Sequence, residues 1–122
     1  MEMIAHKKYV LPNPNKRELK KHGFRHNKEM SDSEGDFYSL KFPVLQYHNV
    51  TTVEGEIIID LNTGDIRINA YNYGQKEYYS PFYYTECSEI YEPIMKKINN
   101  QFQIVFHKLG ITEISNGKQK LA

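Results

Sequence analysis

The amino-acid sequence contains no tryptophan, only one cysteine, and no unbroken aliphatic stretch longer than Ile57–Ile59. A single thiol, Cys87, cannot form an internal disulfide, so we expect a fold that does not depend on an oxidising compartment. The aliphatic stretch is far too short to span a membrane, and residues 1–10 hold no apolar segment typical of secretion. The sequence therefore predicts a soluble, cytoplasmic protein with no membrane partner.

The length and composition fit one folded domain. The chain has 122 residues, of which 39% are hydrophobic and 25% charged, values that are ordinary for a globular protein. We expect an extended basic lead-in over residues 1–14, a single α+β domain over 15–111, and a flexible polar tail over 112–122.

The charge is unevenly distributed although the net charge is only +1. Residues 1–28 carry eight Lys or Arg and two acids, whereas residues 29–122 carry eight Lys or Arg and thirteen acids. A basic arm of this kind attracts nucleic acid or an acidic protein surface, or it folds back onto the acidic remainder of its own chain. The sequence leaves these readings open.

Two segments have helical signals. Asn15 followed by Glu18 resembles a capping box, which predicts a short helix over residues 16–22 that ends at Gly23. Apolar residues at helical spacing predict a long helix over 92–109, with Pro93 in its first turn and a C-terminal cap at Gly110.

Three segments alternate like strands: residues 37–47, 53–61 and 65–73. Pro43 cannot donate to a ladder, so the first strand either lies at a sheet edge or carries a bulge. A four-residue loop over 61–64 would pair Ile57 with Ile68 and keep both isoleucine rows on one face. The opposite face of the second strand then carries Glu54, Glu56 and Asp60, where charges normally meet water.

These elements together predict an α+β fold. We expect an antiparallel sheet of three or four strands, with one long C-terminal helix packed on one face and a short N-terminal helix.

Metal-binding and catalytic patterns are weak. His22 and His26 have a helical ligand spacing, but Gly23 interrupts the helix between them. The acidic run of residues 32–36 lacks the glycine position of a calcium loop, and Cys87 has no base that the sequence places beside it. We therefore assign no metal site, no cofactor and no catalytic residue.

Tyrosine is the abundant residue, and seven of the ten tyrosines lie between Tyr71 and Tyr91. A tyrosine ring combines a large apolar body with a polar tip and few rotatable bonds, which suits a surface that binds another molecule. The candidate partner-binding residues are Tyr71, Tyr73, Tyr78, Tyr79, Phe82, Tyr83 and Tyr84.

The sequence thus favours a small non-catalytic binding protein that acts through a macromolecular partner, more readily a protein than a nucleic acid. The alternative is a nucleic-acid-binding accessory protein that uses Lys16, Arg17, Lys20, Lys21, Arg25 and Lys28. An enzyme of unknown chemistry ranks third, because no nucleophile–base pair or metal set can be assembled.

Overall fold

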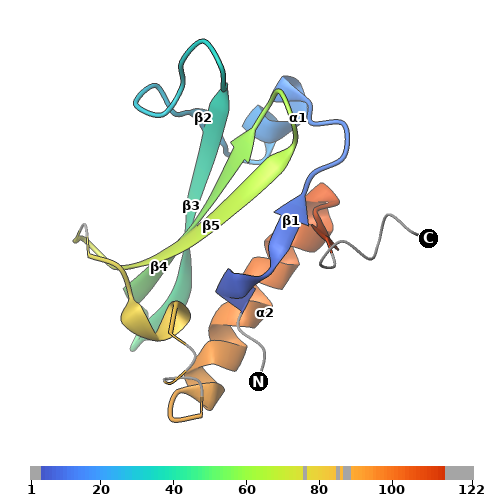
Figure 1. Ribbon diagram of the computed structural model, residues 1–122. Helices are drawn as coiled ribbons and strands as arrows, with labels where there is room; N and C mark the ends of the chain where they lie inside the picture. The colour runs from blue at the N-terminus through green and yellow to red at the C-terminus, as the bar shows by residue number, and fades with distance from the viewer. Residues whose placement is uncertain (1–3, 76, 85, 87–88, 115–122) are drawn as a thin grey trace.

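The computed structural model describes residues 4–75, 77–84, 86 and 89–114. Within them, six strands form one antiparallel sheet in the order β2-β3-β4-β5-β1-β6, and helix α2 lies across one face of it (Figure 1). In chain order the elements are η1 (Ile4–His6), β1 (Lys8–Val10), α1 (Lys16–Lys21), β2 (Arg25–His26), β3 (Phe37–Tyr47), β4 (Val50–Asp60), β5 (Asp65–Asn72), η2 (Ser80–Phe82), α2 (Glu92–Leu109) and β6 (Thr112–Ile114). The predicted α+β class is confirmed.

The β4–β5 hairpin has the predicted register. Ile57 pairs with Ile68 and Ile59 with Ile66, and both Ile57 and Ile59 are fully buried. Gly64, with φ of 84°, allows the tight return of the chain. The parity of the apolar rows was therefore sufficient to fix which face of this hairpin meets the core.

Helix α2 supplies the other half of the core. Its buried residues are Met95, Ile98, Phe102 and Phe106, and Gly110 ends it with φ of 80° and an N–H donated to the Phe106 carbonyl. No helix within the described residues is long and apolar enough to cross a membrane.

Phe102 sits against the sheet where β4 has no side chain. A Cβ atom at Gly55 would lie 2.6 Å from Val44 Cγ1 and 2.9 Å from Phe102 Cζ. The glycine therefore makes room for the ring, which also packs edge-on against Phe42 at 5.1 Å between centroids. This close approach positions α2 on the face of the sheet that carries Ile57 and Ile59, which we call the inner face.

Strand β3 carries a bulge next to Pro43, which is one of the two arrangements predicted for this proline. The β3–β4 register shifts between Pro43 and Leu45 and again between Leu45 and Gln46. The strand β2 pairs with β3 only at Tyr38 and Ser39, so the proline lies beyond that ladder and displaces no hydrogen bond to β2.

The expectation of three or four strands was too low, because the short strands β1, β2 and β6 were not predicted. Residues 8–10, expected in an extended lead-in, form β1 between β5 and β6, and residues 112–114, expected in the tail, form β6. Two or three residues are too few to show an alternating pattern. A long-range contact holds β1 in place instead, since its Tyr9 packs on Phe106 of α2 with 4.7 Å between ring centroids.

Candidate partner-binding site

The tyrosine segment, residues 71–84, folds back against the end of β5. Tyr78 forms an isolated antiparallel β-bridge with Tyr71 through the backbone. On either side of it, the Asn72 N–H donates to the Glu77 carbonyl and the Tyr79 N–H donates to the Ala70 carbonyl. The short helix η2 then places Phe82 in the core, where it stacks on Phe102 at 5.5 Å. The segment is therefore attached to the domain at both ends, with Lys76 outside the described residues.

The aromatic rings of this segment divide by exposure. Tyr73, Tyr78 and Tyr84 are 54%, 55% and 54% exposed, and we call these three the aromatic surface. Tyr71, Tyr79 and Tyr83 are half-buried. Phe82, the last residue of η2, is fully buried, so it belongs to the core and is unavailable to a partner. Its ring has no polar group and packs inward, whereas a tyrosine hydroxyl can remain at the surface.

One of the exposed rings, Tyr78, rests on two half-buried ones. Tyr78 stacks on Tyr71 with 5.1 Å between centroids and 22° between planes, and it meets Tyr83 at 5.3 Å in an edge arrangement. Tyr84 lines a cavity of about 310 Å³ together with Tyr78 and Tyr83. Tyr73 occupies the turn beyond β5, where its N–H donates to the Thr52 carbonyl.

A hydrogen-bonded network on the outer face of the sheet, the face opposite α2, holds the supporting rings. Glu56 Oε1 accepts from the Tyr71 hydroxyl at 2.8 Å and from Asn69 Nδ2 at 3.1 Å. The Tyr83 hydroxyl donates to Asn69 Oδ1 at 3.1 Å and accepts from the Ala70 N–H at 3.0 Å. Both phenol groups are thus fixed in position by strands β4 and β5.

The pKa values of the two supporting phenols follow from this environment. Burial raises the pKa of Tyr71 well above its ordinary value of about 10, and the hydrogen bond to Glu56 and the nearby negative charge of Glu56 raise it further. Burial raises the pKa of Tyr83 to about 12 although the Ala70 hydrogen bond opposes the shift. Both groups therefore remain neutral hydrogen-bond donors at ordinary pH.

The structure corrects the expectation that the carboxylates on the outer face meet water. Glu56 is only 6% exposed and Asp60 only 9% exposed, and Asp60 Oδ1 accepts from the Asn62 N–H at 2.9 Å. Strand parity assigns a residue to a face but does not show what covers that face. Here the tyrosine segment and the loop after β2 cover it.

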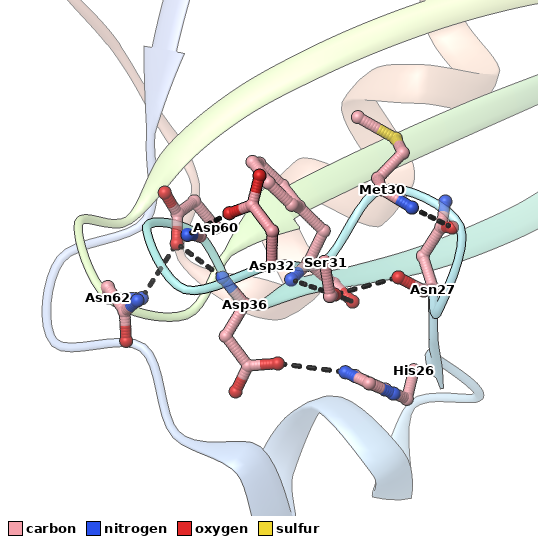
Figure 2. Close-up of polar contacts among 10 residues, drawn as sticks. His26, Asn27, Met30, Ser31, Asp32, Asp36, Asp60 and Asn62 are labelled. Atoms are coloured by element: carbon pink, nitrogen blue, oxygen red, sulfur yellow. Dashed lines mark hydrogen bonds and ion pairs between the residues drawn. The ribbon is translucent and has the colours of Figure 1, made fainter.

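That loop, residues 27–36, is ordered by its own polar side chains, as Figure 2 shows. The Asn27 side chain accepts from the Met30 N–H at 3.2 Å, and the Ser31 hydroxyl donates to the Asn27 carbonyl at 2.7 Å. His26 Nε2 lies 2.9 Å from Asp36 Oδ1. The acidic run of residues 32–36 is therefore a structured turn that fixes the edge of the outer face.

Two neighbouring cavities lie under this loop. The first, the Glu56 cavity, measures about 410 Å³ and is lined by Asn27, Glu29, Glu56, Arg67, Tyr71 and Tyr78 among others. The second, the basic cavity, measures about 760 Å³ and includes Arg25, Lys28 and Lys41 together with the shared Glu29 and Glu56. The aromatic surface thus continues into a charged concave region that sequence reasoning missed.

The six candidate nucleic-acid residues are all exposed. Lys16, Arg17, Lys20 and Lys21 lie on α1, apart from Arg25 and Lys28 in the basic cavity. None of the six forms an ion pair with another described residue. Lys7 of the same basic arm does pair with an acid of the chain, since its Nζ lies 3.3 Å from Glu113 Oε1.

The metal-binding hypothesis that the sequence disfavoured gains nothing from the fold. His26 pairs with Asp36, and the described residues contain no group of three or more side chains able to hold a metal ion. Cys87 lies outside the described residues.

Comparison with known proteins finds no match to this chain among protein-family models, curated proteins or solved structures. The class that the fold itself defines is an α+β protein with a tyrosine-rich aromatic cluster on its sheet.

Proposed function

We propose that this chain is a non-catalytic binding protein whose aromatic surface contacts a protein partner. The observation that carries the proposal is the exposure of Tyr73, Tyr78 and Tyr84 in one short segment. Two half-buried rings of that segment, Tyr71 and Tyr83, are hydrogen-bonded to the sheet. Exposed aromatic side chains on fixed supports lose little conformational freedom when they bind, which is the property of interface hot spots.

A protein partner explains this arrangement better than a nucleic acid. Carboxylates lie near one of the exposed rings, Tyr78. Glu77 directly precedes it and accepts from the Asn72 amide, and Glu29 and Glu56 line the same cavity as Tyr78. A phosphate backbone laid along these rings would meet negative charge, whereas a protein can present matched cationic and apolar groups. A cytoplasmic location forms part of the proposal, because a chain with one cysteine has no internal disulfide that would require an oxidising compartment.

The test compares partner recovery by the native chain and by variants of the aromatic surface. Tyr73→Ala, Tyr78→Ala and Tyr84→Ala, alone and combined, should each lower recovery of the partner. The affinity should fall by about 30-fold for a residue worth about 2 kcal/mol. Ile104→Ala is the matched control, because Ile104 is a 49% exposed apolar residue on α2. The proposal fails if the triple variant keeps its partners while its melting temperature is unchanged.

A nucleic-acid accessory role is the second candidate, and its support is that none of the six exposed cations forms an ion pair with another residue that the structure describes. Reversing Lys16, Arg17, Lys20 and Lys21 to Glu should abolish salt-sensitive binding to single-stranded RNA or DNA in a filter or anisotropy assay. If this charge-reversed variant still recognises the partner as well as the native chain does, the basic arm has no role in that recognition.

A further inference from the structure

Among the described residues, only one of the two carboxylate oxygens of Glu56 accepts a hydrogen bond. Oε1 accepts both the Tyr71 hydroxyl and the Asn69 amide, and no described group donates to Oε2. Yet no buried side-chain oxygen in the described residues lacks a partner, so Oε2 is reachable from one of the two cavities that Glu56 lines. A side chain that is 6% exposed therefore presents one free acceptor to the outside.

Two cations on the neighbouring strands, Lys41 and Arg67, do not form an ion pair with this carboxylate. Lys41 pairs across the ladder with Glu56, but its Nζ lies over the Tyr71 ring, 5.7 Å from the centroid. Arg67, in the same cavity, has its guanidinium over the Phe37 ring at 5.6 Å. Among the described residues neither forms an ion pair with Glu56. A largely buried, unpaired charge is costly, and a cation supplied from outside would offset that cost.

The lining of the Glu56 cavity favours a flat cation. Tyr78, 55% exposed, lines the same cavity and offers a ring for stacking, while Glu29 adds a second negative charge at the rim. A guanidinium can donate to a carboxylate and stack on an aromatic ring at the same time, which a lysine ammonium does less well. We propose that the Glu56 cavity is a subsite for an arginine side chain of the protein partner; this inference rests on the proposed function.

A small probe tests the chemistry without the partner. N-acetylarginine amide, titrated into the ¹⁵N-labelled chain at low salt, should shift the backbone signals of Glu56, Asn69 and Tyr71 saturably, with a Kd of about 1 mM for a single side chain. N-acetyllysine amide should bind several-fold more weakly. N-acetylcitrulline amide, which has the same shape without the charge, should cause no saturable shift.

Glu56→Gln keeps an oxygen for Tyr71 and Asn69 but removes the charge, so the variant should stay folded and weaken arginine binding at least tenfold. Glu54→Gln is the matched control, because Glu54 lies on the same face of β4 two residues away and lines neither cavity. Tyr78→Leu should weaken arginine binding and abolish the preference over lysine. Equal shifts with citrulline, no saturable shift with arginine, or unchanged binding in Glu56→Gln would each overturn the subsite.

The outcome for the partner separates this inference from the proposed function. Loss of the partner in both Tyr84→Ala and Glu56→Gln supports both. Loss in Tyr84→Ala with full retention in Glu56→Gln leaves the aromatic surface in place and refutes the arginine subsite. A third outcome is that Tyr84→Ala and the triple tyrosine variant both keep the partner, while the isolated chain still binds arginine in a way that depends on Glu56. That outcome refutes the proposed function but not the arginine-binding chemistry of the cavity.

Discussion

Phe82 connects the tyrosine segment to the core, and removing its ring should destabilise the whole domain. The ring is fully buried, stacks on Phe102 at 5.5 Å and meets Tyr83 edge-on at 5.1 Å. Truncating a buried Phe to Ala costs about 3–5 kcal/mol, and the loss of two aromatic pairs places this site in the upper part of that range. Phe82→Ala should therefore cost about 4 kcal/mol, a large share of the roughly 5–15 kcal/mol expected for a domain of this size.

Urea unfolding followed by circular dichroism measures this change directly. The midpoint should fall while the slope of the transition stays the same, because the surface exposed on unfolding is nearly unchanged. Tyr84→Ala is the control from the same segment: its ring is 54% exposed, so the cost should stay below about 0.5 kcal/mol. If Phe82→Ala is as mild as Tyr84→Ala, the segment is not attached to the core and the argument for a fixed aromatic surface fails.

Two further predictions test the packing and the hydrogen-bonded network. Gly55→Ala should cost about 1–3 kcal/mol because its methyl group would overlap Val44 and Phe102, and adding Phe102→Leu should make the pair less than additive in the same urea assay. Below pH 10 the phenol of Tyr83 is protonated in both the folded and the unfolded chain, so its contribution to stability is complete there. As the pH rises from 10 to about 12 the unfolded chain loses the proton before the folded chain does. The free energy of unfolding should therefore fall, by less than about 1.4 kcal/mol per pH unit because solvent screens the half-buried phenol. Tyr83→Phe should make that fall shallower, and an unchanged profile would contradict the assignment.

Much of the fold could be predicted because local signals and parity agreed. The cap at Asn15, the glycine after α2 and the isoleucine rows of the hairpin each have a mechanism that acts within a few residues. Strands β1 and β6 could not be predicted, since each has three residues and depends on partners far away in the chain.

The candidate site was predicted only in outline. The concentration of tyrosines marked the segment, but Phe82 was included although it is buried. Glu56 was missed as a site residue, because the burial of a residue on the outer face depends on which loops cover it. One signal was present: the hairpin register set Glu56 opposite Asn69 and diagonal to Tyr71, a distance that long side chains can bridge.

The most direct measurement of the central claim is photo-crosslinking from the aromatic surface. A p-benzoylphenylalanine placed at Tyr84 should crosslink to one protein partner on irradiation, and the added change Tyr78→Ala should reduce that product strongly. The same residue at Ile104, on the outward side of α2, should give none of it. Equal crosslinking from both positions, or a product at Tyr84 that does not respond to Tyr78→Ala, would contradict a binding surface built on these tyrosines.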